Sequence, residues 1–357
     1  MNKRVLLGMS GGVDSSVSAI LLQEAGYEVI GATMKLWEDE ENPCNESTCC
    51  SFSAVNDAKR VCDILEIPHY TLNYKEEFKK YVIDNFINCY ECAKTPNPCI
   101  ECNKHLKFDC FFRKAKELGC DYIATGHYAK TEYSDEFERY VLKKSNSQKK
   151  DQTYFLYNMP SSIVENVLFP LAVYEDKEDV RKIAEEHGLR IARKPDSQEI
   201  CFIPDNNYIG FLNKNMKVKP KCGNIVLTDG RVLGKHNGII NYTIGQRKGL
   251  GVSYKEPLYV IDIKPETNEV IVGKEEMLYS NELTASVLNW MAIDELEEPL
   301  ELEAKIRYRS KESKCIVYPI ENDKVKVVFN EPQRAITRGQ SVVFYKDNIV
   351  IGGGIID

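Results

Sequence analysis

The 357-residue sequence lacks several features that would each indicate a class of protein. It has no run of about 20 apolar residues, which excludes a membrane-spanning helix. Its first residues lead straight into an expected strand without a signal-peptide pattern, so we expect a cytoplasmic protein that does not act at a membrane. It also has no internal repeat and no long low-complexity tract, which excludes repeat architectures. The length predicts two or three globular domains of roughly 100–200 residues each.

An excess of positive charge is missing too, because the formal net charge is −7. The total argues mildly against a nucleic-acid-binding protein. Basic residues are nevertheless clustered, and a local cluster can bind phosphates on an acidic protein. The clusters are Lys143, Lys144, Lys149 and Lys150, then Lys214, Lys217, Lys219 and Lys221, then Arg307, Arg309, Lys311 and Lys314. Ordinary solvated surface charge is the alternative interpretation of each.

The most informative segment is Ser10–Ser16, with the sequence SGGVDSS. It follows an apolar run and precedes an amphipathic one, which predicts a strand, a tight loop and a helix. Gly11 and Gly12 allow a sharp turn that brings backbone N–H groups close to a ligand. The positive end of the helix dipole points to the same place, so the segment predicts a polyphosphate site. A Gly-Gly turn capped by serine is the alternative.

The loop lacks the Lys-Ser/Thr pair of a Walker A motif, because Val13 and Asp14 stand in that place. It resembles instead the loop of the PP-loop ATP pyrophosphatases. That resemblance implies that the loop holds the β- and γ-phosphates of ATP and that pyrophosphate leaves as a substrate oxygen is adenylated.

Strand and helix signals alternate over the first two hundred residues. Strands are expected at 28–33, 69–72 and 122–125, with an apolar helix face over 54–65. The pattern predicts an α/β fold with a Rossmann-like parallel sheet, whose ligands lie at the carboxyl ends of the strands. After residue 206 the sequence pattern changes to glycine-rich loops and short runs of β-branched residues. Strict alternation in 300–306, 324–329 and 341–345 then predicts an antiparallel sheet or small barrel. We therefore expect domains at 1–206, 207–278 and 279–357.

Cysteine is abundant, with thirteen residues, an odd number. Without an export signal, such thiols are expected to act as nucleophiles, redox groups or metal ligands. Two C-x-x-C pairs lie close together, Cys89 with Cys92 and Cys99 with Cys102. Their spacing is shorter than that of a zinc ribbon, so a four-cysteine metal site and a redox role both stay open. Cys201 is a further candidate, as a thiolate or as a small buried residue.

Taken together, these segments resemble the bacterial tRNA-specific 2-thiouridylases, which are PP-loop enzymes of the adenine nucleotide alpha hydrolase type. The matching segments are 8–15, 95–98 with 102–104, 124–128, 150–156, 196–197 with 200–203, 245–251, 307–309 and 335–340. They cover nearly the whole chain in order.

The resemblance implies ATP-dependent 2-thiolation of the wobble uridine of tRNA. The uridine C2 oxygen attacks the α-phosphate of ATP with Mg²⁺ present, and a persulfide on Cys201 delivers sulfur with Cys102 as partner thiol, closing a disulfide in one variant of the reaction. A sulfur-donor protein, such as a cysteine desulfurase or a relay protein, is implied as a partner. The implied ATP-binding residues are Gly8, Met9, Ser10, Gly11, Gly12, Val13, Asp14, Ser15, Met34 and Gly126. The implied tRNA-binding residues are Asn97, Pro98, Cys99, His127, Lys150, Asp151, Gln152, Arg307, Tyr308 and Gln340.

The sequence departs from that family at Cys99, where many members carry an aspartate. The departure leaves open an iron–sulfur cluster held by Cys99, Cys102 and Cys201, although the persulfide route is preferred because two thiols suffice for it. Two other functions also stay open. A PP-loop ligase or amidotransferase is disfavoured by the paired cysteines and the C-terminal β domains. An RNA-binding metal module without turnover is disfavoured by the intact phosphate loop.

Overall fold

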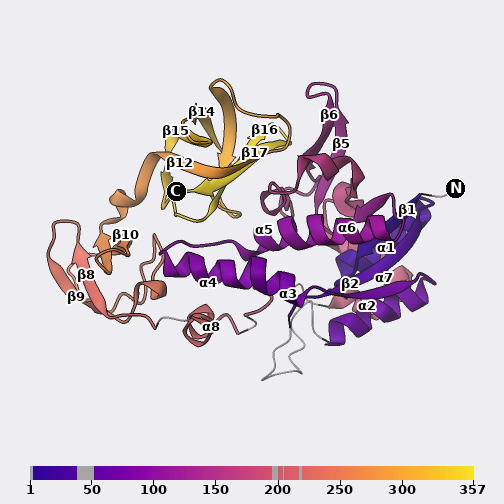
Figure 1. The fold of residues 1–357 in the computed structure, drawn as a ribbon, viewed down its shortest axis with the longest axis horizontal. Helices are drawn as coiled ribbons and strands as arrows, with labels where there is room; N and C mark the ends of the chain where they lie inside the picture. Colours follow the sequence, from indigo (N-terminus) through magenta and orange to yellow (C-terminus); the bar gives the residue numbers. More distant parts are fainter. Residues whose placement is uncertain (1–2, 38–51, 195–199, 204, 217–218) are drawn as a thin grey trace.

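The computed structural model describes residues 3–37, 52–194, 200–203, 205–216 and 219–357 (Figure 1). The predicted segment 196–197 and the lysine at position 217 lie outside these ranges. No helix within them is both long and apolar enough to cross a membrane.

A five-stranded parallel sheet forms the N-terminal part, as the alternating pattern predicts. Its order is β3-β2-β1-β4-β7. The bounds are β1 Arg4–Gly8, β2 Glu28–Lys35, β3 His69–Asn73, β4 Tyr122–Ala124 and β7 Val167–Leu168. Side chains alternate between the two faces of a strand, and in β1 Leu6 packs into one core while Val5 and Leu7 pack into another. The sheet is therefore covered on both faces.

Different helices cover the two faces. The core around Val5 contains side chains from α1 (Val13–Glu24), α2 (Phe52–Ile64) and α7 (Lys177–Glu186). The core around Leu6 contains side chains from a continuous helical segment. It consists of α5 (Pro98–Cys102), a π-helical stretch Asn103–Cys110 and α6 (Phe111–Glu117).

A second helical layer extends from the sheet towards the central domain (Figure 1). It comprises α3 (Lys75–Phe78), a π-helical stretch Lys79–Ile83 and α4 (Asp84–Glu91). Aromatic side chains of this layer pack against α8 (Tyr208–Asn215), for example Phe86 against Phe211. The central domain beyond it is a four-stranded sheet of order β10-β11-β8-β9. Its strands are β8 Gly223–Leu227, β9 Val232–His236, β10 Tyr259–Lys264 and β11 Glu269–Gly273.

The C-terminal strands close into a six-stranded antiparallel barrel, because β12 pairs with both β15 and β17. The strands are β12 Tyr279–Trp290, β13 Leu300–Lys305, β14 Ser313–Ile320, β15 Lys324–Arg334, β16 Ser341–Lys346 and β17 Ile349–Ile356. The predicted alternation is observed in β13, where Leu302 and Ala304 are buried and Glu301 is exposed.

A hairpin from the first part of the chain joins this barrel sheet. Strands β5 (Ala129–Ser134) and β6 (Arg139–Lys144) pair with each other, and Lys143 of β6 pairs with Ile349 of β17. Short 3₁₀ helices occupy the connections at Thr153–Phe155, Ser161–Asn166, Pro170–Val173, Arg190–Arg193, Ile239–Asn241 and Glu275–Leu278.

Candidate active site

The segment between β1 and α1 forms the tight glycine turn between a strand and a helix that the sequence predicts. Gly11 has a φ of 69°, and a Cβ atom there would lie 2.4 Å from the carbonyl oxygen of Ala54, so only glycine fits. The Ser15 hydroxyl accepts a hydrogen bond of 3.2 Å from the Ser10 backbone N–H and donates one of 3.2 Å to the Gly12 carbonyl. These bonds close the loop over the first turn of α1.

The other residues that were predicted to bind ATP lie around this loop. The side chains of Met9 and Val13 are buried and pack into the hydrophobic core beneath the loop. A Cβ atom on Gly126 would lie 2.8 Å from the backbone nitrogen of Ser15, so the chain after β4 passes directly against α1. A Cβ atom on Gly8 would lie 3.8 Å from Cε of Met34. The structure therefore brings together the ends of β1, β2 and β4, as the sheet topology predicts.

Asp14, in the first turn of α1, has a partner on each carboxylate oxygen. Its Oδ1 accepts a hydrogen bond of 3.2 Å from the Tyr128 hydroxyl, and its Oδ2 lies 2.8 Å from Nζ of Lys177. Sequence reasoning missed this ion pair. The two residues are 163 positions apart, and no local pattern marks the lysine.

A second lysine reaches the loop from the other side. Nζ of Lys194 lies 3.4 Å from the Gly11 carbonyl oxygen and 2.8 Å from Oδ2 of Asp57, on α2. Lys194 thus links the glycine turn to α2 through two hydrogen bonds.

The segment Asn97–Cys102 begins a helix with Asn97 as its N-cap. The Asn97 side chain accepts a hydrogen bond of 3.2 Å from the Cys99 backbone N–H, and Pro98 occupies the first turn of α5. Cys99 is exposed, whereas Cys102, one turn later, is 8% exposed. The two thiols of this pair are therefore in different environments.

The structure brings Cys102 and Cys201 into the same hydrophobic cluster. Cys102 is a buried member, and Cys201 is partly buried and packs against it, beside the buried Phe202. Met34 also packs against this cluster. Met34 therefore lies between the cluster that contains the two cysteines and the end of β1, where the phosphate loop begins.

The cysteines that the structure describes show no metal centre. Outside the undescribed segments, no three histidine, cysteine, aspartate or glutamate side chains come close enough to hold one metal ion. Cys99, Cys102 and Cys201 thus do not fit a cluster held by three thiolates, and the two C-x-x-C pairs do not fit a four-cysteine site. Burial raises the pKa of Cys89 to about 11, which keeps that thiol protonated at neutral pH.

The C-terminal barrel contacts the segment that leads into α5. The Gln340 side-chain amide donates a hydrogen bond of 2.8 Å to the Thr95 carbonyl oxygen, and the Thr95 backbone N–H donates one of 2.8 Å to the Arg338 carbonyl. Gln340 was predicted to contact tRNA, and here it connects the barrel with the cysteine segment.

Arg307 and Tyr308 lie in the connection after β13. The Arg307 guanidinium donates hydrogen bonds to the Ala335 carbonyl and, at 2.8 Å, to the Thr337 hydroxyl. Burial lowers its pKa. The Tyr308 ring packs 4.4 Å from the ring of Phe155, measured between centroids.

The predicted segment 150–152 lies against the chain that carries Tyr128. Gln152 and Tyr128 exchange two hydrogen bonds, of 2.9 and 3.0 Å. The Asp151 carboxylate accepts hydrogen bonds from the Ser145 N–H and the Thr153 hydroxyl, but burial dominates and raises its pKa. Lys150 is partly buried. Within the neighbouring basic cluster, Lys143 pairs with Glu132 at 2.7 Å, so part of the cluster charge is neutralised.

His127 follows β4 and lies beside Lys107 of the π-helical stretch Asn103–Cys110. Its Nδ1 is 2.8 Å from the Thr125 hydroxyl, and its Nε2 is 3.3 Å from Nζ of Lys107. Desolvation and the Lys107 charge hold the pKa of His127 well below its ordinary value. The ring is therefore neutral at pH 7, and its Nε2 can accept a hydrogen bond from the ammonium.

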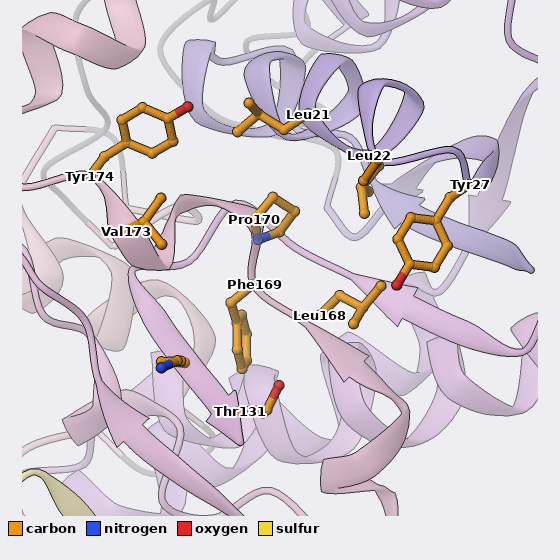
Figure 2. A pocket seen from close by; sticks show the side chains of 11 residues that line it. Leu21, Leu22, Tyr27, Thr131, Leu168, Phe169, Pro170, Val173 and Tyr174 are labelled. Carbon is orange, nitrogen blue, oxygen red and sulfur yellow. The ribbon is translucent and has the colours of Figure 1, made fainter. Parts of the chain in front are cut away.

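A separate apolar pocket of about 330 Å³ lies at the opposite end of α1 from the loop (Figure 2). Leu21, Leu168 and Val173 line it, and Tyr27 and Tyr174 border it. None of the predicted site residues contributes to this pocket.

Comparisons with known proteins show which families the three parts of this chain match. Residues 3–205 match the family described as the tRNA methyl transferase HUP domain. Residues 209–274 match the tRNA methyl transferase PRC-barrel domain, and residues 280–356 match the aminomethyltransferase beta-barrel domain. A solved complex of a 4-thiouridine synthetase with RNA and bound ATP aligns at 18% identity and a TM-score of 0.37, over 59% of this chain and 50% of that chain.

Full-length relatives are much more similar. The tRNA-specific 2-thiouridylase MnmA of Clostridioides difficile (strain 630) is 54% identical over 100% of this chain and 99% of its own length. That of Clostridium botulinum (strain Alaska E43 / Type E3) is 56% identical over 99% of this chain and 98% of its own length. The chain belongs to the family of tRNA-specific 2-thiouridylases.

Proposed function

We propose that this protein uses ATP to replace the C2 oxygen of the wobble uridine in tRNA by sulfur. One observation carries the proposal. Met34 contacts the end of β1, where the phosphate loop begins, and also packs against the cluster that contains Cys102 and Cys201. The loop and the cluster that contains both thiols thus border the same methionine, which supports a reaction with an adenylation step and a sulfur-transfer step.

In the first step, the C2 oxygen of uridine attacks the α-phosphate of ATP, and pyrophosphate leaves. The N–H groups of residues 8–15 and the N-terminal end of α1 would bind the β- and γ-phosphates. Met34 and Gly126 would border the adenine. The carbonyl carbon becomes electrophilic because AMP is a far better leaving group than oxide.

Mg²⁺ bound to ATP would supply charge neutralisation during this step. Asp14, the acidic residue of the loop, already has Lys177 and Tyr128 on its two carboxylate oxygens. We therefore assign Asp14 to ordering the loop and not to holding the metal.

In the second step, the outer sulfur of a Cys201 persulfide attacks C2, and AMP leaves with the oxygen. The Cys102 thiolate then attacks the inner sulfur, which frees the 2-thiouridine and leaves a Cys102–Cys201 disulfide. Alternatively, Cys102 attacks the persulfide first, and the hydrosulfide released attacks C2. A sulfur-donor protein would reload Cys201, and an external thiol would supply the two electrons that reduce the disulfide.

The tRNA would approach between the helical layer and the barrel. Asn97, Pro98 and Cys99 would border the target base, with His127, residues 150–152, Arg307, Tyr308 and Gln340 around them. A base in an anticodon loop suits such a site, because unstacked single-stranded RNA can be splayed into a pocket. We place the reaction in the cytoplasm, where tRNA is available.

Release of pyrophosphate from ATP by the purified protein, with and without unmodified tRNA, tests this function. A 2-thiouridylase releases pyrophosphate in proportion to the tRNA added. A PP-loop ligase for a small substrate would ignore tRNA, and an RNA-binding module would release none.

A further inference from the structure

Lys177 is a buried cation in the immediate surroundings of the phosphate loop. It is 8% exposed at the first position of α7, and its Nζ lies 2.8 Å from Oδ2 of Asp14. The opposite oxygen of Asp14 accepts a hydrogen bond from Tyr128, which is 2% exposed. The carboxylate of Asp14 is thus held from two sides by groups that are distant in sequence.

Asp14 occupies a position where its charge has two opposing effects. A carboxylate in the first turn of a helix interacts favourably with the helix dipole. The same charge lies at the end of α1 that would receive the phosphates of ATP, and like charges repel. A cation bonded to the carboxylate preserves the favourable interaction with the helix dipole and offsets the repulsion of the phosphates.

We propose that Lys177 is a positioning residue for ATP binding, which acts by neutralising and orienting Asp14 beneath the phosphate loop. The proposal rests on the proposed function, because it takes ATP as the ligand of the loop. Lys177 acts through Asp14 and does not itself touch the nucleotide. Tyr128 fixes the second oxygen, so that the carboxylate does not turn towards the phosphates.

The same helix supplies a matched control. Lys182 forms an ion pair of 3.0 Å with Asp179, and both side chains are more than half exposed. Exposed pairs of this kind contribute little to stability. Lys182→Met removes the same charge from α7 without affecting the loop.

The experiment measures the Kd for ATP by equilibrium dialysis, without tRNA, at low and high ionic strength. Lys177→Met leaves the Asp14 charge without its cation, and we expect ATP to bind roughly tenfold more weakly at low salt. The defect should shrink at high salt, because salt screens the repulsion. Lys182→Met should bind ATP like the wild type, and Lys177→Arg should retain most of the affinity.

The double variant Asp14→Asn/Lys177→Met is decisive. It removes both charges and keeps an acceptor for Tyr128, so ATP affinity should recover most of the loss. No recovery would overturn the proposal, because Lys177 would then contact the phosphates directly. A loss that does not change with salt would also overturn it, since that result indicates a packing defect. Thermal unfolding of each variant verifies that the fold is intact.

Failure of the proposed function gives a different result. A wild-type protein that binds no ATP contradicts the function itself. If the wild-type protein binds ATP and the Lys177→Met variant binds it equally well, that result contradicts only the proposed role of Lys177.

Discussion

The Gln340 side chain donates a hydrogen bond of 2.8 Å to the carbonyl oxygen of Thr95, across 245 residues of sequence. The neighbouring backbone bond from Thr95 to Arg338 makes this part of the chain an attachment to the barrel. Three residues after Thr95, the chain enters α5, the helix that carries Cys99 and Cys102. The barrel, which has no thiol in this site, therefore sets the position of the cysteine segment.

Gly339→Ala tests this attachment. Gly339 has a φ of 85°, and a Cβ atom there would lie 2.8 Å from Cβ of Lys94 and 3.0 Å from the Thr95 backbone nitrogen. The segment before α5 must shift to accommodate it. We expect thiolation to fall roughly tenfold or more, because small misplacements of reacting groups are costly, while the Kd for ATP stays unchanged.

Gly230→Ala is the control for that variant. Its φ is 92°, but nothing lies within 4 Å of the added Cβ. Both variants carry backbone strain of about 1–2 kcal/mol, and only Gly339→Ala adds the clash. Equal loss of thiolation in the two variants would show that strain, and not the attachment to Thr95, causes the defect.

Protonation of His127 should destabilise the fold in mild acid. Its pKa is lowered in the folded state, so below about pH 6.5 the unfolded chain binds a proton that the folded chain does not. Stability attributable to this residue is therefore complete above that pH and decreases as the pH falls towards the folded-state pKa. The decrease is at most about 1.4 kcal/mol per pH unit for one proton.

Thermal unfolding at pH 7.5 and 5.5 measures this effect. His127→Gln should lose less stability between the two values than the wild type does. Lys107→Met should also reduce the loss, because the Lys107 charge contributes to lowering the pKa of His127. If all three proteins lose the same stability, another group controls the acid response.

Much of the fold could be predicted from the sequence because its signals are local. The apolar run before the SGGVDSS segment predicts β1, and strict alternation predicts β13, β15 and β16. The meeting of Gly8, Met34 and Gly126 follows from the parallel topology, which places strand ends at one edge.

Other features depend on contacts between distant segments. In the sequence, nothing distinguishes Lys177 from many other charged residues near the start of a helix. Only the fold places it against Asp14. The hairpin of β5 and β6 precedes residue 206 in sequence but extends the barrel sheet, because the first residue of β17, Ile349, pairs with Lys143 of β6. The π-helical turns after Cys102 have no recognisable sequence signal.

The thiols of the first C-x-x-C pair should differ in reactivity. Burial raises the pKa of Cys89 to about 11, whereas Cys92 is exposed. Because the thiolate is the reactive form, iodoacetamide at pH 8 should modify Cys92 well before Cys89. Peptide mass spectrometry over time measures both rates, and the buried Cys62, whose pKa is raised to about 12, serves as a slow reference. Equal rates at Cys89 and Cys92 would contradict the raised pKa of Cys89.

Cys201→Ser and Cys102→Ser should each abolish thiolation at different steps. The Cys201 variant cannot hold the persulfide. The Cys102 variant should still accept sulfur on Cys201 from a persulfide donor, because Cys102 acts later. Intact-protein mass spectrometry after incubation with the donor distinguishes them, since one added sulfur is expected on the Cys102 variant at position 201. Full activity of the Cys201 variant with free sulfide would remove Cys201 from the reaction.

The most direct test is nucleoside mass spectrometry of unmodified tRNA after incubation with the purified protein, ATP and a persulfide donor. We predict that the wobble uridine exchanges one oxygen for sulfur at C2, that the exchange requires ATP, and that the Cys201→Ser variant does not perform it. Unchanged wobble uridine with the wild-type protein under these conditions, or thiolation without ATP, would contradict the proposed reaction.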